Sequence, residues 1–513
     1  MPTASTHGIS TFKGEQRASR GDRIGAPALL LSVLAATAPL MVVAGVIPTA
    51  FGTAGVVGVP LLFVIVGVLL ALFGVGYAEM SRHVHNAGAL YACVSRGLGG
   101  TMGAGASYVA LFAYGAMQIG TYGIFGFEMS GQVFQHWHLA VAWWIPALGG
   151  VVVTAVFGAL KIGLNARTLG VLLAVETLLT LVLDVSFLGD AGPQGVSAHA
   201  FDPGTLGGAG LGSALCFVTA GFVGFEQAPV YAEETRDPRR AVSRVTFLAI
   251  GFATVFFAFS SWAITVATGP AHVVGRSREQ SANLVFALDR GRLGGAFTDT
   301  LHVFLVTGIF ASMLGFHNVV ARYAFAMGRD GLLPAAIGRT SKSSGAPAVG
   351  SLLQSGVALV VVALFALTDH GAFGPRGPDP TAPVLRLFTW AGGVGALGVL
   401  LLMATAAVAV IAFFVKRGAA AVQGWRLAAS GLAAVGLLAV LVCSVKDFAV
   451  LLGADPGHGL RWALPGTVAL AAVTGLAHGA VLRARRPQVH AGIGQGNEAF
   501  QLEKAAAASE AAE

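Results

Sequence analysis

Residues 213–234 read SALCFVTAGFVGFEQAPVYAEE, an apolar segment in which Gly221 and Gly224 are followed by Glu226 and Pro229. A charged side chain at the centre of a membrane helix costs about 2.5–3.5 kcal/mol on insertion scales, so Glu226 must face protein, water or a ligand. Two glycines at this spacing are also found where two helices pack closely. We favour an interrupted helix, because an acid follows the glycines within one turn.

A second apolar segment carries a comparable interruption. Residues 29–48 read LLLSVLAATAPLMVVAGVIP. Pro39 has no backbone donor and its ring clashes with the carbonyl group of Ala35, so we expect this helix to unwind around residues 37–39. Gly45 is a second weak point. For this segment alone, a packed proline kink is an equally good interpretation.

The whole chain is too apolar for an ordinary soluble protein. Of its 513 residues, 55% are hydrophobic and 11% charged, and the mean hydropathy is +0.75. Soluble domains carry about 25% charged residues. This composition excludes a cytosolic enzyme, a nucleic-acid binder and a disordered scaffold. The three cysteines have no spacing typical of disulfides or metal sites, so we interpret them as core residues.

Apolar runs long enough to span a bilayer recur along the chain. We expect twelve spans, at residues 27–48, 59–81, 100–127, 141–160, 166–189, 210–232, 244–268, 299–325, 347–368, 384–415, 427–446 and 461–482. Residues 24–482 then form one twelve-helix membrane domain. Residues 1–23 form a polar N-terminal tail without a cleaved signal, and residues 483–513 form a loose C-terminal tail.

The basic residues predict the orientation. With twelve spans, both termini lie on one side, which holds 23 of the 31 Lys and Arg residues and leaves 8 on the other. The positive-inside rule therefore places both termini in the cytoplasm. The net charge of +7 is explained by these loops, without a nucleic-acid partner.

The two interrupted segments occupy matching positions if the chain holds two inverted halves of five spans. The halves would be residues 24–189 and 210–415, with residues 427–482 adding two more helices. Interruptions at matching positions are the best sequence pointer to a transporter binding site. Amide groups freed at such breaks suit an anionic group, and freed carbonyl groups suit an ammonium group.

Three motifs in order resemble the amino acid–polyamine–organocation superfamily, in particular bacterial amino acid permeases. They are GYAEMSRHVHNAGALYACVSRGLG (76–99), GFVGFEQAPVYAEETRDPRR (221–240) and LGFHNVVARYAFAMGRDGLLP (314–334). The resemblance implies an all-α, five-plus-five inverted-repeat fold with discontinuous first and sixth spans. It also implies alternating-access transport of an amino acid or related amine. It further implies a gating role for Glu226 and a pocket lined by Thr37, Ala38, Pro39, Leu40, Gly221, Phe222, Val223, Gly224 and Phe225.

The Thr-Ala-Pro sequence at residues 37–39 departs from the glycine-rich break of many relatives. It resembles the polyamine and putrescine importing branch and some related amino acid permeases, which favours an amine substrate. Phe222 and Phe225 could then cap the site or offer a ring face to a cation. Glu176, in span 5, lies near the place where proton-coupled relatives carry a lysine. A buried carboxyl group can exchange a proton, so we expect H+ coupling, with a packing glutamate as the alternative.

Tyr114, Gln118 and Tyr122 recur every four residues, so this face of span 3 either reaches the cavity or packs against another helix. No catalytic, cofactor or metal motif occurs in the sequence. We therefore expect a plasma-membrane importer of an amino acid or amine. The alternatives are an exchanger, a polyamine or ethanolamine permease, a non-transporting nutrient sensor and an intramembrane enzyme. The oligomeric state stays open.

Overall fold

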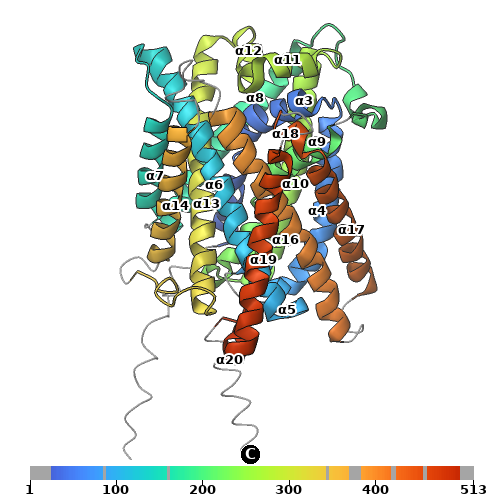
Figure 1. Cartoon of the computed structure of the whole chain (residues 1–513). Coiled ribbons are helices and arrows are strands. Elements are labelled where there is room, and N and C mark those ends of the chain that lie inside the picture. The colour runs from blue at the N-terminus through green and yellow to red at the C-terminus, as the bar shows by residue number, and fades with distance from the viewer. Residues whose placement is uncertain are drawn as a thin grey trace, which may run out of the picture.

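The computed structural model describes residues 25–84, 88–158, 162–208, 210–341, 346–368, 383–417, 423–453 and 459–496. Within these ranges, all regular structure is helical. The long helices run side by side between two ends of the molecule (Figure 1). The short helices α3, α11 and α12 lie at one end, and α5 and α20 lie at the end that carries the C terminus.

The long helices, with the short segments that continue them, take the places of the expected spans. Their bounds are α1 Ala26–Thr37, α2 Pro39–Met41, η1 Val42–Val46, α3 Ile47–Ala54, α4 Val59–Ser81, α6 Gly100–Trp137, α7 Trp144–Gly158, α8 Ile162–Gly189, α9 Leu211–Phe222, η4 Phe225–Glu234, α10 Pro238–Thr268, α13 Gly295–Arg329, α14 Ala348–Thr368, η6 Pro383–Phe388, α16 Thr389–Lys416, α17 Gly424–Lys446 and α19 Leu460–Arg485. The short helices between and after them are α5 Ala89–Leu98, η2 His199–Phe201, η3 Pro203–Leu206, α11 Val273–Gln280, η5 Ser281–Asn283, α12 Leu284–Arg290, α18 Phe448–Leu451 and α20 Pro487–Gly492.

Ten helical segments in the described part of the chain are long and apolar enough to cross a membrane. The third and fourth expected spans are the two that differ from this pattern. Helix α6 is 38 residues long and continues to Trp137, past the expected end at residue 127, but it is less apolar than the ten. Helix α7 is apolar but only 15 residues long.

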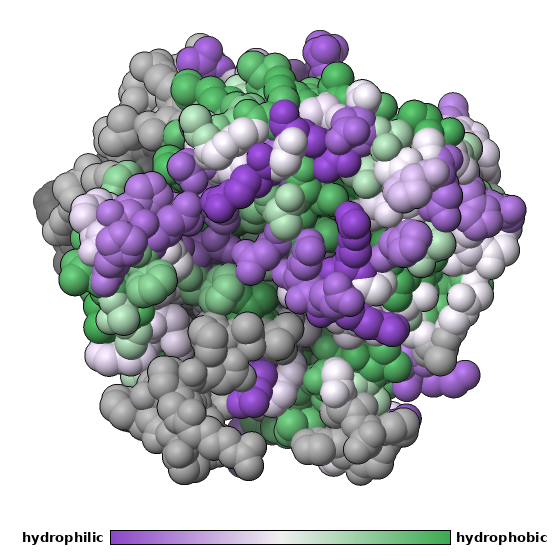
Figure 2. Space-filling view, turned by 90° about the horizontal axis from the view of Figure 1, so that it is seen from above, coloured by the Kyte–Doolittle hydropathy of each residue, from purple (hydrophilic) through white to green (hydrophobic). Residues whose placement is uncertain are grey.

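Large apolar side chains are exposed on the outer helices, as expected for a surface that faces lipid. They include Val156 on α7, Leu178 on α8, Leu352 on α14, Leu432 on α17 and Leu470 on α19. The end that carries α11 and α12 differs, because hydrophilic residues gather across its centre (Figure 2). The chain is therefore a multi-span membrane protein with polar material at this end.

The first apolar segment is interrupted where Pro39 predicts. Helix α1 ends at Thr37, Ala38 takes the left-handed conformation with φ +40°, and α2 starts at Pro39. The chain then continues as a π-helix over Val42–Val46, which contains the second expected weak point, Gly45.

The sixth segment is interrupted at its glycines. Helix α9 ends at Phe222, and Gly224 takes φ +133°, a conformation that is essentially restricted to glycine. The chain resumes as the 3₁₀-helix η4 instead of an α-helix. Pro229 lies inside η4. Both expected interruptions are thus present in the backbone.

Residues 483–496, expected as part of a loose tail, instead continue α19, form α20 and contact the rest of the protein. Helix α20 follows α19, and Ile493 is buried. Ser95 Oγ donates a hydrogen bond of 2.6 Å to the carbonyl oxygen of Ile493. Asp330 Oδ2 accepts hydrogen bonds from Gly494 N, at 2.7 Å, and from the Tyr91 hydroxyl, at 2.9 Å. An apolar side chain and a buried carboxylate hold residues 487–496 against α5 and the end of α13. The expected tail at residues 1–23 and residues 497–513 lie outside the described residues.

Candidate substrate and coupling site

The two interrupted helices lie against each other. A Cβ atom built on Gly224 would lie 3.0 Å from Thr37 Cγ2 and 3.3 Å from the carbonyl oxygen of Val33. Both neighbours belong to the last turns of α1. The glycine at the sixth-span break therefore lets that backbone approach the first-span break closely.

A small cavity lies beside both breaks. Its volume is about 40 Å³, room for about three or four water molecules at roughly 10–15 Å³ each. A site for a larger organic ligand typically has at least about 300 Å³. The cavity is therefore too small for such a ligand in this structure. Its lining is mostly apolar and consists of Ala36, Thr37, Met41, Val42, Val46, Met117, Thr121, Ala220, Val223, Phe316, Phe388 and Gly392.

At the first break, partners from other helices meet the freed backbone groups. The Leu40 amide donates a hydrogen bond of 2.6 Å to Glu176 Oε1 on α8. Ser312 Oγ on α13 donates a hydrogen bond of 2.9 Å to the carbonyl oxygen of Ala36. Glu176 is 2% exposed. Its Oε2 lies against Gly308 of α13, where an added Cβ would be only 2.6 Å away.

At the sixth break, the partner comes from the same segment. Glu226 is 1% exposed, and its Oε2 accepts a 2.9 Å hydrogen bond from the Gly224 amide. Its Oε1 accepts a 2.6 Å hydrogen bond from the Tyr114 hydroxyl, and the Tyr77 hydroxyl donates to its backbone carbonyl at 3.1 Å. The Tyr114 ring also stacks on Tyr323, with centroids 5.5 Å apart. Glu226 thus joins the break to α4 and α6.

The residues of the predicted pocket take different positions. Thr37 and Val223 line the cavity, and Ala38 and Gly224 lie at the breaks themselves. Pro39 and Leu40 begin α2, and Gly221 lies in the last turn of α9. Phe222 and Phe225, for which a cap or a ring face for a cation was considered, pack in aromatic clusters and are not among the lining residues. The ring centroid of Phe222 lies 5.9 Å from that of Phe63 and 6.4 Å from that of Phe257, and Phe225 lies 6.3 Å from Phe73.

Gln118 belongs to a polar network between helices. Its Nε2 donates to the Tyr122 hydroxyl at 2.8 Å and lies 3.2 Å from His317 Nδ1, and its Oε1 accepts from Gln354 Nε2 at 2.7 Å. His317 Nε2 lies 2.7 Å from Ser351 Oγ. The neighbouring residues of α6, Met117 and Thr121, line the cavity. These contacts favour the helix-packing interpretation of Gln118.

One acidic residue was not singled out from the sequence. Asp184 on α8 is fully buried and accepts a 2.6 Å hydrogen bond from Ser260 Oγ on α10. Its Oδ1 has no hydrogen-bond partner in the described part of the protein. Glu176, Thr180 and Asp184 follow at four-residue steps, so they share one side of α8. This four-residue spacing is the feature of the sequence from which a role for Asp184 could have been predicted.

Among the described residues, no group of three or more His, Cys, Asp or Glu side chains is placed to hold a metal ion.

Comparison with known sequences identifies the family. The model of the family described as amino acid permease matches residues 30–473. The branched-chain amino acid permease BcaP of Lactococcus lactis is 24% identical over 214 residues, which cover 40% of this chain and 44% of BcaP. The low-affinity putrescine importer PlaP of Escherichia coli is 26% identical over 153 residues, 29% of this chain and 31% of PlaP. The chain therefore matches less than half the length of each of these relatives.

Comparison with solved structures supports the fold. Crystal structures of two mutants of the manganese transporter of Eremococcus coleocola align over 88% of this chain and 93% of theirs. The TM-score is 0.55 and the sequence identity is 12%. At this identity the likeness concerns the fold alone.

Proposed function

The chain belongs to the amino acid permease family, whose members are membrane transporters and not enzymes, and we propose that it imports an amino acid with an apolar side chain. The observation that carries the proposal is the apolar cavity between two broken helices that touch each other. Breaks of this kind place backbone groups inside the bilayer, where they are tolerated only beside protein or a cavity. The partial similarity to a branched-chain amino acid permease supports the same substrate class.

The membrane arrangement belongs to this proposal. We count α6 and α7 as spans, which gives twelve, with residues 24–189 and 210–415 as inverted halves and residues 427–482 as two added helices. We place both termini in the cytoplasm of a cell whose plasma membrane holds the protein. The excess of basic residues on the side of the termini supports this orientation.

We assign proton coupling to Glu176. An ionised carboxylate makes a charge-assisted hydrogen bond to the Leu40 amide, and this bond ties the first break to α8. When a proton from outside neutralises Glu176, that bond weakens, and α2 can move relative to α8. Release of the same proton on the cytoplasmic side restores the bond, so one proton is carried inward for each cycle.

Uptake into proteoliposomes tests the transport proposal. Purified protein should accumulate labelled leucine, isoleucine or valine when the outside is more acidic than the lumen. Binding of these amino acids without accumulation would instead identify a non-transporting sensor. Accumulation that requires preloaded substrate and ignores the pH gradient would identify an exchanger.

Glu176→Gln tests the coupling assignment separately. Glutamine can still accept the Leu40 hydrogen bond but cannot ionise, so we expect exchange to persist and accumulation driven by the pH gradient to disappear. Glu128→Gln is the matched control. Glu128 is also a buried glutamate, but it lies 3.5 Å from His302 Nδ1, away from the breaks. Normal gradient-driven accumulation by Glu176→Gln would remove Glu176 from the coupling step.

An amine is the second candidate substrate, and one observation favours it. Each break already has an amide bonded to a glutamate, Leu40 to Glu176 and Gly224 to Glu226. A substrate carboxylate must compete with these side chains, whereas an ammonium group would find two carboxylates near the breaks. The partial similarity to a putrescine importer agrees with this alternative. Competition of putrescine or ethanolamine against leucine uptake distinguishes the two candidates.

A further inference from the structure

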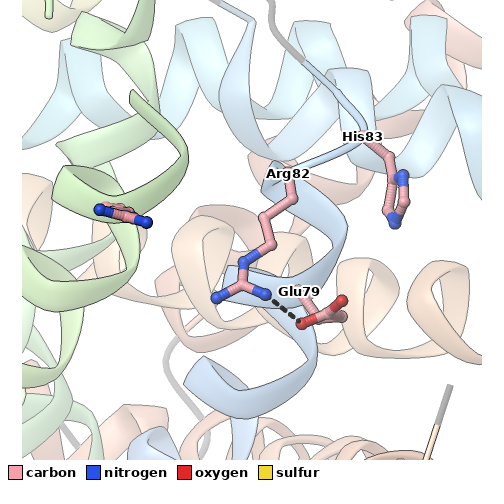
Figure 3. Close-up of a pocket in the computed structure, with 4 residues that line it drawn as sticks. Glu79, Arg82 and His83 are labelled. Atoms are coloured by element: carbon pink, nitrogen blue, oxygen red, sulfur yellow. Dashed lines mark ion pairs between the residues drawn. The ribbon is translucent and has the colours of Figure 1, made fainter. Parts of the chain in front are cut away.

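A basic recess lies at the end of the molecule that carries α5 (Figure 1). It has a volume of about 430 Å³ and is lined by Glu79, Arg82, His83 and Arg240. Glu79 lies in the last turn of α4, Arg82 and His83 directly follow it, and Arg240 lies in the first turn of α10. Figure 3 shows Glu79 and Arg82 facing each other, with His83 beside them. The volume lies in the range of small-molecule sites.

Among the described residues that line the recess, positive charges outnumber negative ones. Arg82 NH1 lies 3.4 Å from Glu79 Oε2, and Arg426 of α17 donates a hydrogen bond to the same oxygen. One carboxylate therefore serves two guanidinium groups. Arg240 adds a third, and in the described part of the chain it has no hydrogen-bond or ion-pair partner. Arginine guanidinium groups match phosphate oxygens in a bidentate geometry, so the recess suits a phosphate group.

The surroundings of the recess indicate which kind of molecule would carry the phosphate group. It lies where two apolar spans, α4 and α10, end and begin. Trp425, next to Arg426, is 58% exposed and its indole N–H is bonded to Gln423 Oε1. Exposed tryptophans of this kind are typical of the headgroup layer of a membrane.

An apolar surface continues from the recess along α10. Phe247 is 39% exposed and Leu248 is 48% exposed, and they follow Arg240 by seven and eight residues, two helical turns. They therefore lie on the same side of α10 as Arg240. A charged recess followed by an exposed apolar strip matches an amphiphile, with its phosphate at the arginines and its chains along α10.

We propose that this recess binds the headgroup of an anionic phospholipid. The bound phosphate would bridge Arg82 and Arg240, and so hold the end of α4 to the start of α10. Both helices adjoin the sixth-span break, because the Tyr77 hydroxyl of α4 donates to the Glu226 carbonyl, and α10 follows η4. The lipid would therefore stabilise the segments that carry this break.

The test compares three samples by melting temperature and lipid affinity. They are the unchanged protein, the Arg82→Gln/Arg240→Gln variant and an Arg276→Gln/Arg290→Gln control. The control removes two exposed arginines from α11 and α12, at the other end of the molecule. Each protein in mild detergent is titrated with phosphatidylglycerol, with phosphatidylcholine and with inorganic phosphate.

We expect phosphatidylglycerol to raise the melting temperature of the unchanged protein and the control, and phosphatidylcholine to have little effect. Loss of two guanidinium groups should weaken phosphatidylglycerol binding about thirtyfold. Equal responses of the recess variant and the unchanged protein would overturn the proposal. A similar gain with inorganic phosphate alone would show that the recess takes a free anion and would overturn the assignment to lipid.

A second measurement, on a single variant, tests the site even where the Arg82→Gln/Arg240→Gln variant folds poorly. Arg240→Gln alone removes no ion pair in the described residues, and native mass spectrometry can count the phosphatidylglycerol molecules that remain bound to it. We expect at least one fewer than on the unchanged protein. An unchanged count would contradict the proposed site.

Discussion

The breaks in the first and sixth spans each have a backbone amide bonded to a glutamate, but the two glutamates come from different parts of the chain. In each, a carboxylate meets an amide that the interrupted helix leaves free. Glu176 reaches Leu40 from a helix 136 residues away in sequence, whereas Glu226 meets Gly224 from two residues away. The first contact must therefore break when α2 moves away from α8. The second can travel with its own segment, which makes the sixth break a self-contained hinge.

The backbones of the two breaks also differ. Ala38, with φ +40°, lies near the left-handed region that non-glycine residues occupy occasionally. Gly224, with φ +133°, lies where side chains are rarely tolerated. The backbone conformation at the sixth break therefore requires glycine, whereas the conformation of Ala38 at the first break does not.

The largest expected effect is that of Gly224→Ala. The backbone conformation costs about 1–3 kcal/mol for a residue with a side chain, and the new methyl group would meet Thr37 Cγ2 at 3.0 Å. We expect a lower melting temperature and loss of uptake. Ala38→Gly, the matching change at the first break, should keep both close to normal.

Gly251→Ala on α10 controls for the loss of glycine as such, because no atom lies within 4 Å of its added Cβ. The contrast between the breaks is wrong if Gly224→Ala melts and transports like Gly251→Ala.

The next largest effect is the difference in stability between Glu226→Gln and Glu176→Gln. Glu226 accepts a hydrogen bond at each carboxylate oxygen, whereas Glu176 has one such bond among the described residues. Glutamine has one acceptor oxygen, so Glu226→Gln leaves a buried donor unpaired, at about 1–3 kcal/mol. Glu176→Gln should cost much less. Thermal unfolding of the two variants in one detergent measures the difference, and equal shifts would contradict the comparison.

Ser312→Ala should have a smaller effect. It removes the hydrogen bond that holds the Ala36 carbonyl to α13, worth about 1 kcal/mol. Because that bond joins two helices, we expect faster hydrogen exchange in α1 and a change in uptake rate. Ser261→Ala is the control, since Ser261 Oγ bonds to Phe257 within its own helix. Similar rates of hydrogen exchange in α1 for both variants would show that Ser312 does not hold the first break in place.

The smallest effect concerns a third carboxylate that accepts a backbone amide, away from both breaks. Burial raises the pKa of Asp330 to about 6, although its hydrogen bonds from Gly494 and Tyr91 act in the opposite direction. If the carboxyl group is less buried once residues 487–496 detach, its pKa is then lower. The docked state therefore binds the proton more tightly. Docking should strengthen as pH falls through about 6 and weaken above it.

Limited proteolysis of the C-terminal segment at pH 5.5 and pH 8 checks this sign. We expect slower cleavage at pH 5.5, and no pH dependence in Asp330→Asn. Faster cleavage at the lower pH would contradict the linkage.

The two interruptions could be predicted from the sequence because their causes are local. Pro39 lacks a donor, and Gly224 permits a conformation that other residues avoid. The partner of Leu40 could not be paired with it, because Glu176 is brought there by the packing of α8. Phe222 and Phe225 looked available to a ligand, but Phe63, Phe73 and Phe257 on neighbouring helices cover them.

Other features depended on tertiary contacts that composition does not report. Residues 487–496 are polar or small except for a few side chains, so their sequence predicts a tail. Ile493 finds a buried position, and Asp330 supplies an acceptor from more than 150 residues away. Asp184 likewise has its hydrogen-bond donor, Ser260, on another helix, α10.

The π-helix at Val42–Val46 has a consequence for how the segment that follows it, Ile47–Ala54, should be probed. Accommodating one extra residue in a turn shifts every later side chain by about 100° around the axis relative to a regular α-helix. A helical wheel drawn continuously from Pro39 through Ala54 would therefore assign lipid-facing and inward-facing positions wrongly beyond Val46. Cysteine-accessibility scans of Ile47–Ala54 should be interpreted with their phase reset at that turn.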